Sequence, residues 1–257
     1  MTVIVDRPPA TRRELGFEVG VVLLLSLGQS AVYSVVSLVA KLTAGKPLSQ
    51  QTATLNPSQS PRPYLDLTYQ LLGIFFALVP VVLALYLLHR DRLSPVRTLG
   101  LDGRRPGADL GWGTALAACI GLPGLLLVFA AAQLGLNAQI IPAALNPVWW
   151  AVPVLIMAAL QNAILEEVIV VGYLMTRLRA FGWRVWWIVG TSAVLRGSYH
   201  LYQGFGAFVG NAVMGVVFSL YFLRRGRVMP LIVAHGLLDI AAFVGYTLLP
   251  KDWLDWL

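Results

Sequence analysis

The chain has 257 residues, of which 58% are hydrophobic and 12% are charged, and its net charge is +7. Soluble globular proteins carry about twice this share of charged residues, so the composition excludes an ordinary soluble domain. Nucleic-acid binding would need a concentrated basic face with interleaved aromatic residues, and the sequence offers none. We therefore expect a protein whose partner is the lipid bilayer and not a nucleic acid.

Apolar segments follow one another along the chain. Three of them carry no charged residue and exceed the roughly 20 residues that a helix needs to cross the hydrocarbon. They are Val19–Ala40, Leu67–Leu88 and Leu110–Leu136. Four more apolar segments follow, the second of which is the shortest: Trp149–Thr176, Val185–Tyr202, Gly204–Leu223 and Val228–Leu249. Because helices satisfy the backbone inside a bilayer, the sequence predicts an all-α polytopic transmembrane bundle of about seven spans.

Basic residues gather in alternate gaps between these segments. Arginines precede the first span and follow spans two, four and six, whereas the other gaps hold only Lys41, Lys46, Arg62 and Lys251. This positive-inside pattern predicts a multi-pass protein of the cell membrane with a cytoplasmic N-terminus. With seven spans, the C-terminal residues Lys251–Leu257 would lie outside.

The loops divide the chain into two regions. Residues 1–147 form an anterior region of three spans, with an exterior loop at residues 41–64 and a cytoplasmic loop at residues 89–109. Residues 148–257 form a posterior region of four spans, which we expect to be a catalytic helical core. The sequence contains no internal repeat.

The ionisable residues at membrane depth all fall in the posterior region. They are Glu166, Glu167, Arg196, His200, His235 and Asp239. A charge near the bilayer centre costs several kcal/mol and marks a functional site by default. Such residues, drawn from three helices, can converge in a bundle core. There they would activate a water by general-base catalysis or bind a metal ion.

Spacing supports this convergence but leaves structural alternatives open. Arg196 and His200 stand four residues apart, as do His235 and Asp239, so each pair shares one face of its helix. A histidine in a membrane helix can instead serve as an interhelical hydrogen-bond donor. Arg196 could also extend along the helix to the membrane interface.

Three segments resemble the motifs of the CPBP family, which comprises CAAX prenyl endopeptidases and Abi-like, bacteriocin-processing intramembrane proteases. The run from Glu166 to Gly172 resembles the EExxxRG motif, and the segment around His200 resembles the FxxxH motif. The run from His235 to Asp239 resembles the HxxxN/D motif. The motifs stand in the family's order on separate spans, and the resemblance covers about Trp149–Val244.

The resemblance implies an intramembrane endopeptidase that acts on a peptide or protein substrate, prenylated or otherwise anchored in the membrane. Glu166 would act with His200 to activate the attacking water, beside the second motif carboxylate, Glu167. His235 and Asp239 would face the developing oxyanion, whose stabilisation is usually the largest catalytic contribution. Members are often described as metalloproteases. A divalent metal such as zinc is therefore a candidate cofactor, with Glu166, His200, His235 and Asp239 as its candidate ligands.

The sequence departs from the family pattern at two positions. Val171 stands where the first motif has arginine, and Arg196 stands where the second has phenylalanine. An unpaired carboxylate in the bilayer would be protonated or expelled. We therefore expect that the arginine has moved to the neighbouring helix, where Arg196 neutralises Glu167 and supports the site.

Two other functions fit the same residues. The chain could be a non-catalytic member of the family that serves as an immunity or scaffold protein in the membrane. It could also be a proton-coupled transporter that uses glutamate and histidine as a relay. The transporter interpretation lacks the inverted repeat and the second polar half that such proteins use.

Overall fold

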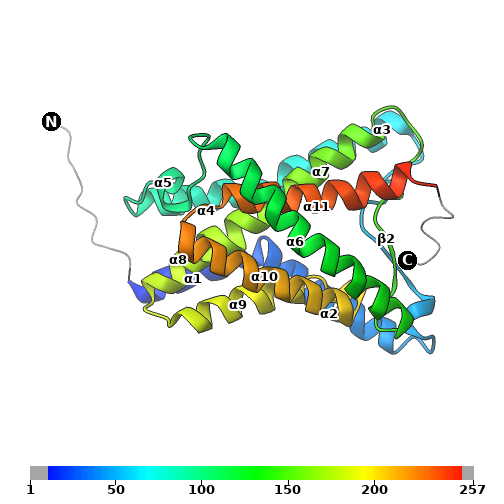
Figure 1. Ribbon diagram of the computed structural model, residues 1–257, viewed down its shortest axis with the longest axis horizontal. Helices are drawn as coiled ribbons and strands as arrows, with labels where there is room; N and C mark the ends of the chain where they lie inside the picture. Colours follow the sequence, from blue (N-terminus) through cyan, green and yellow to red (C-terminus); the bar gives the residue numbers. More distant parts are fainter. Residues whose placement is uncertain (1–10, 251–257) are drawn as a thin grey trace.

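The computed structural model describes residues 11–250 and shows a bundle of helices that run along one common direction (Figure 1). The predicted exterior segment Lys251–Leu257 lies outside the described residues, as does Arg7, one of the arginines that precede the first predicted span. The anterior elements are α1 (Arg12–Leu24), α2 (Leu27–Leu42), η1 (Leu48–Gln50), β1 (Thr52–Thr54), α3 (Pro63–Ala77), α4 (Val79–Arg90), α5 (Pro95–Leu99), α6 (Pro106–Gln133) and β2 (Gln139–Ile141).

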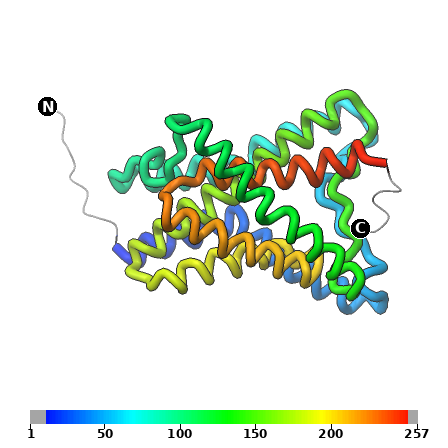
Figure 2. Tube along the Cα trace, viewed as in Figure 1, coloured from blue at the N-terminus to red at the C-terminus, as the bar shows by residue number. Residues whose placement is uncertain are grey.

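The posterior elements carry the predicted site residues. They are α7 (Ala151–Glu166), the π-helix η2 (Glu167–Tyr173), α8 (Leu174–Ala180), α9 (Val185–Ser198), the 3₁₀ turn η3 (Leu201–Gln203), α10 (Phe205–Arg225) and α11 (Met229–Leu248). In Figure 2, α6 lies across α10 and α11, and it packs against both of them. The anterior and posterior regions therefore share one bundle.

The all-α, polytopic character of the chain is confirmed, whereas the count of seven spans stays a prediction. Within residues 11–250, five helical stretches are long and apolar enough to cross a membrane. A sixth would be the pair α1 and α2, which are bent by 54° relative to each other. The predicted fifth span corresponds to α9, which has 14 residues and a length of about 21 Å. That length is too short for the hydrocarbon, and α9 lies against α10 instead.

One continuous helical stretch, α7–η2–α8, changes its winding where the site lies. The backbone N–H of Leu174 donates to the carbonyl oxygen of Ile169, the i→i+5 pattern of a π-helix. All seven residues of η2 are buried, and Val168, Ile169 and Val170 belong to the main apolar core. π-helical turns are rare and frequently occur at functional sites, and this one begins at Glu167, directly after Glu166.

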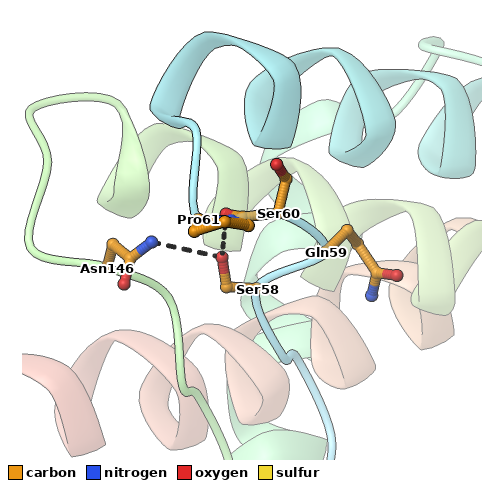
Figure 3. Close-up of a pocket in the computed structure, with 5 residues that line it drawn as sticks. All are labelled: Ser58, Gln59, Ser60, Pro61 and Asn146. Atoms are coloured by element: carbon orange, nitrogen blue, oxygen red, sulfur yellow. Dashed lines mark hydrogen bonds between the residues drawn. The ribbon is translucent and has the colours of Figure 1, made fainter.

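Polar loops close one end of the bundle, opposite the end where α8 and α10 finish. β1 and β2 pair in parallel, with Thr52 opposite Gln139, and so join the predicted exterior loop at residues 41–64 to the segment between α6 and α7. Asp66 at the start of α3 is fully buried and accepts a hydrogen bond from the Ser58 hydroxyl at 2.5 Å. The Asn146 amide also donates to Ser58, across a shallow hollow of about 280 Å³ (Figure 3). This hollow lies in the loops and holds none of the predicted site residues.

The other end of the bundle, where α1 begins and α8 and α10 end, is rich in arginine, and we call it the arginine-rich end. Ion pairs connect the helices to one another there. Arg177 of α8 contacts Asp91 at 2.6 Å and Glu18 of α1 at 3.4 Å. Arg227, between α10 and α11, contacts Asp109 at 2.6 Å and Asp102 at 3.0 Å. The hydrogen bond from Arg227 lowers the pKa of Asp102, and the one to Asp109 raises the pKa of Arg227. The Arg177 contacts hold α1, α4 and α8 together. The Arg227 contacts connect the α10–α11 turn to the start of α6.

Candidate active site

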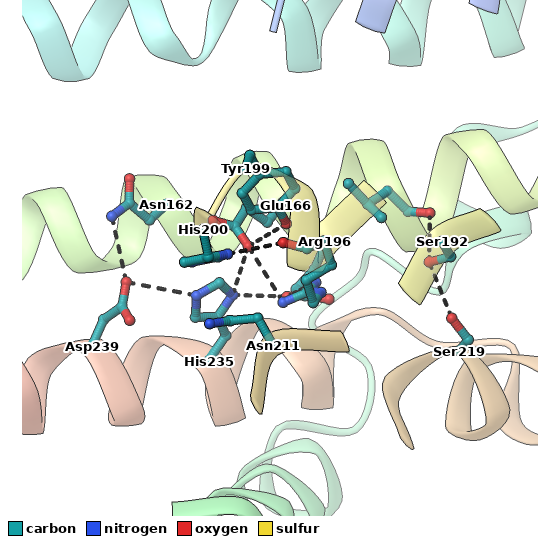
Figure 4. Close-up of polar contacts among 12 residues, drawn as sticks. Asn162, Glu166, Ser192, Arg196, Tyr199, His200, Asn211, Ser219, His235 and Asp239 are labelled. Atoms are coloured by element: carbon teal, nitrogen blue, oxygen red, sulfur yellow. Dashed lines mark hydrogen bonds and ion pairs between the residues drawn. The ribbon is translucent and has the colours of Figure 1, made fainter. Parts of the chain in front are cut away.

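Three helices bring the predicted site residues into one buried cluster (Figure 4). Glu166 ends α7 and Glu167 begins η2, Arg196 lies in the last turn of α9, and His235 lies on α11. All four side chains are buried. The convergence expected from three separate motifs is thus present in the structure.

Arg196 pairs with both glutamates. Its Nη2 donates to Glu167 Oε1 at 2.6 Å, and its Nη1 lies 3.3 Å from Glu166 Oε2 in an ion-pair contact. The side chain is 0% exposed, so the alternative in which Arg196 reaches the membrane interface is wrong. Val171, where the family motif has arginine, is fully buried in the apolar core around η2. The positive charge beside Glu167 therefore comes from α9.

The two oxygens of the Glu166 carboxylate have different surroundings. Oε2 accepts a hydrogen bond from the Tyr199 hydroxyl at 2.7 Å and faces Arg196. Oε1 makes no hydrogen bond or ion pair with any residue in the described part of the chain. Oε2 is thus held by one hydrogen bond and one ion-pair contact, which leaves the lone pairs of Oε1 as the available proton acceptor.

The hydrogen bond of His200 determines which of its ring nitrogens carries the proton and which keeps a lone pair. Nδ1 lies 2.9 Å from the backbone carbonyl oxygen of Arg196. A carbonyl oxygen only accepts, so Nδ1 must carry the proton and the neutral ring keeps a lone pair on Nε2. The ring is half-buried, and it is close enough to Glu166 for the two groups to interact electrostatically. Glu166 and His200 therefore each keep one free acceptor atom.

His235 lies between carboxylates on two sides. Its Nδ1 is 2.8 Å from Glu167 Oε1, and its Nε2 is 3.6 Å from Asp239 Oδ2. The latter distance is too long for a hydrogen bond and marks an electrostatic contact. Asp239 is also near the Asn162 amide, at 3.4 Å, and its side chain is 21% exposed. The cluster thus reaches the protein surface at Asp239.

The three donor groups that lie closest together, Glu166, Glu167 and His235, do not fit a divalent metal ion between them. Within residues 11–250, oxygens of Glu166 and Glu167 and a nitrogen of His235 lie within 4.8 Å of one another. However, the Arg196 guanidinium contacts both carboxylates and so takes the place that a cation would need. The nitrogen of His235 that approaches Glu167 donates a proton and has no lone pair for a metal. Metal binding would require this arrangement to be dismantled.

Two residues of the cluster were not assigned from the sequence. Tyr199 donates to Glu166, and Asn162 approaches Asp239. Asn162 precedes Glu166 by four residues, so a polar residue on the same helix face was the available signal. Tyr199 adjoins the motif histidine, but a tyrosine in a membrane helix is equally typical of an interfacial aromatic residue.

Comparison with known proteins agrees with the motifs. The model of the family described as type II CAAX prenyl endopeptidase, Rce1-like, matches residues 147–241. The matched range contains Glu166, Glu167, His200, His235 and Asp239 and ends within α11. No curated protein and no solved structure matches the chain. The resemblance to CPBP proteases expected from three short motifs is thereby confirmed.

Proposed function

We propose that this chain is an intramembrane endopeptidase in which Glu166 and His200 activate water, in keeping with the Rce1-like match over residues 147–241. One observation carries the proposal. Glu166 Oε1 and His200 Nε2 are the two acceptors that the surrounding hydrogen bonds leave available, on a buried carboxylate and a half-buried imidazole. A general base at a buried site with fixed donors around it is the arrangement that water activation needs.

The reaction follows from these acceptors. Glu166 Oε1 takes one proton of the water while His200 Nε2 accepts a hydrogen bond from the other and orients it. The water oxygen then forms a bond to the carbon of the scissile carbonyl. Glu166 returns its proton to the amide nitrogen as the carbon–nitrogen bond breaks, which gives a carboxylic acid and a free amine. Tyr199 and Arg196 hold Oε2, so the carboxylate keeps its orientation through both proton transfers.

His235 is the donor that we assign to the oxyanion. Its Nδ1–H is directed to Glu167, so its Nε2 must carry a proton to stabilise the negative oxygen. The cluster holds three carboxylates and one arginine, and a protonated imidazole at His235 would have a carboxylate near each nitrogen. A single donor of this kind is typically worth about 2.7–4 kcal/mol in the transition state. Asp239 cannot donate while ionised and orients His235 instead.

The substrate class follows from the family and the location. The site is surrounded by membrane-spanning helices and reaches the surface at Asp239, so a peptide chain would enter from that side. We infer a peptide or protein held in the membrane, and the family relationship suggests a prenylated C-terminal segment as its anchor.

We also propose that the arginine-rich end faces the cytoplasm. The start of α1, the α8–α9 turn and the end of α10 all lie at this end in Figure 1, which agrees with the positive-inside pattern. A reporter fused after Arg227 should therefore show cytoplasmic activity in intact cells. Exterior activity of that fusion would reverse the orientation.

Glu166→Gln tests the catalytic assignment. The amide keeps the shape of the side chain but cannot take a proton, so we expect turnover of a fluorogenic prenylated peptide to fall about 10²-fold or more. Glu14→Gln, which removes an exposed carboxylate from the first turn of α1, is the matched control and should retain activity. Both variants should elute as folded protein in detergent.

A comparison of cellular protein termini separates an enzyme from a non-catalytic member even when its substrate is unidentified. Newly formed termini would be compared across the proteome between cells with the wild type and cells with Glu166→Gln. Termini that depend on Glu166 support the proposal. Identical sets of termini, together with equal turnover of the peptide, would favour an immunity or scaffold role.

A further inference from the structure

The arginines at the arginine-rich end fall into two groups. Arg90, Arg177 and Arg227 each contact carboxylates inside the protein. Several other arginines of this end are exposed and make no ion pair within residues 11–250, and four of these lie on α1, at the end of α8 and in the α8–α9 turn: Arg12, Arg13, Arg179 and Arg184. The nearest acid in sequence, Glu14, accepts hydrogen bonds from Thr11 at the start of its own helix. Among the described residues, none of these four arginines is therefore in an ion pair with a carboxylate.

These four arginines come from two segments that are far apart in the sequence but adjacent in space. α1 packs against α8, and Arg12 Nη2 lies 4.0 Å from the position that a Cβ atom on Gly182 would occupy. Gly182 has a φ of +78°, and the N–H groups of Gly182 and Trp183 bond to the last carbonyl oxygens of α8. This Schellman arrangement fixes the α8–α9 turn and the direction of Trp183.

Exposed tryptophans lie directly beside this charge. Trp183 is 45% exposed, Trp186 is 73% exposed and Trp187 is 69% exposed. Trp183, Arg184 and Trp187 line a hollow of about 350 Å³. Indole rings favour the boundary between headgroups and hydrocarbon. The surface thus combines the two chemical groups that recognise the two parts of a phospholipid, its charged headgroup and its acyl region.

We propose that Arg12, Arg184, Trp183 and Trp187 form a binding site for an anionic phospholipid of the adjacent leaflet. The arginines would contact the phosphate, and the indoles would pack along the glycerol and upper acyl chain. A soluble phosphate would not use the exposed indoles, and the hollow is at the end of the spanning helices, where lipid headgroups lie. Basic sites of this kind gain about 1 kcal/mol of binding per arginine from the negative leaflet.

The site has a structural connection to the catalytic cluster. The α8–α9 turn joins the helix that continues from Glu167 to the helix that carries Arg196 and leads into His200. A lipid bound at this turn would therefore hold together two of the three helices that form the cluster. The lipid site itself does not depend on the proposed peptidase activity, because its test measures binding alone.

Native mass spectrometry of the detergent-solubilised full chain tests the proposal, with phosphatidylglycerol and phosphatidylcholine as probes. We expect the wild type to prefer phosphatidylglycerol. Arg12→Gln with Arg184→Gln should weaken phosphatidylglycerol binding about 25-fold, or about fivefold for each arginine, with little change for phosphatidylcholine. Arg97→Gln with Arg105→Gln removes two exposed arginines from the same end, away from the tryptophans, and should bind as the wild type does.

Two further measurements make the result decisive. Arg12→Lys with Arg184→Lys keeps both charges and should retain the preference for phosphatidylglycerol. Glycerol 3-phosphate, which lacks acyl chains, should not displace the lipid at millimolar concentration. Equal losses of phosphatidylglycerol binding in the two double glutamine variants would show that binding depends on net charge alone, and would overturn the proposed site. Displacement by glycerol 3-phosphate would show a soluble-anion site and overturn the assignment to lipid.

Discussion

Replacement of Arg196 by leucine should destabilise the protein more than almost any other single change in the posterior region. The substitution removes a fully buried guanidinium that lies 2.6 Å from one glutamate and 3.3 Å from the other. Glu166 and Glu167 would then remain as two neighbouring charges with His235 as their one nearby partner. Breaking a buried ion pair in this way typically costs about 3–5 kcal/mol, because the remaining charge is stranded.

The geometry gives a similar magnitude. The nearest carboxylate oxygens of Glu166 and Glu167 lie within 4.8 Å. Two like charges at that separation repel by roughly 3 kcal/mol at an effective dielectric constant of about 20. Protonation of one carboxylate would relieve the repulsion and limit the loss. We therefore expect a decrease of about 3–5 kcal/mol, which corresponds to a fall in melting temperature of roughly 6–20 °C.

The assay compares the melting temperatures of five proteins in one detergent. They are the wild type, Arg196→Leu, Glu167→Leu, the double leucine variant, and Val171→Arg with Arg196→Phe. The double leucine variant should lose less than the sum of the two single changes, because fewer charges are left unpaired. The last variant places the arginine where the family has it and should be more stable than Arg196→Leu. Strict additivity of the two leucine substitutions would refute the idea that Arg196 and Glu167 stabilise the fold as a pair.

Two further predictions concern the chemistry of the cluster. Tyr199→Phe removes a hydrogen bond to a charged carboxylate, and such a bond contributes about 1.5–3 kcal/mol, so kcat/KM should fall roughly ten- to a hundredfold. A turnover equal to that of the wild type would mean that Tyr199 does not position Glu166. Because Arg196 takes the cation position between the glutamates, overnight dialysis against a strong chelator should leave turnover unchanged, and a loss that is restored by added zinc would contradict this prediction.

The sequence predicted the membership of the cluster because the bilayer makes each charged residue conspicuous. Glu166, Glu167 and Arg196 stand in otherwise apolar segments, where an unpaired charge costs several kcal/mol and must find a partner. The pairing of Arg196 with Glu167 follows from that requirement together with the valine at position 171, where the resembled motif has arginine, and the structure contains it. The same argument gives no information about Tyr199, which is uncharged and is tolerated in many membrane environments.

Other features depend on tertiary packing and left no local signal. The π-helical turn at Glu167–Tyr173 consists mostly of apolar residues that suit an ordinary helix, and its widening is visible only in the Leu174–Ile169 hydrogen bond. The strands at Thr52–Thr54 and Gln139–Ile141 are three residues each, too short for an alternating pattern to be recognised. Both features are set by contacts between segments far apart in the chain.

The shortness of α9 has a physical reason within the site. The apolar segment from Val185 to Tyr202 is long enough for a nearly complete span, but the helix ends at Ser198. Directly after it, the Tyr199 hydroxyl donates to Glu166, and His200 Nδ1 donates to the Arg196 carbonyl oxygen. A full-length helix would carry those groups away from the cluster. α9 thus ends where Tyr199 supplies a hydrogen-bond donor to Glu166 and His200 supplies an acceptor. The residues that follow the end of α9 therefore complete the proposed active site.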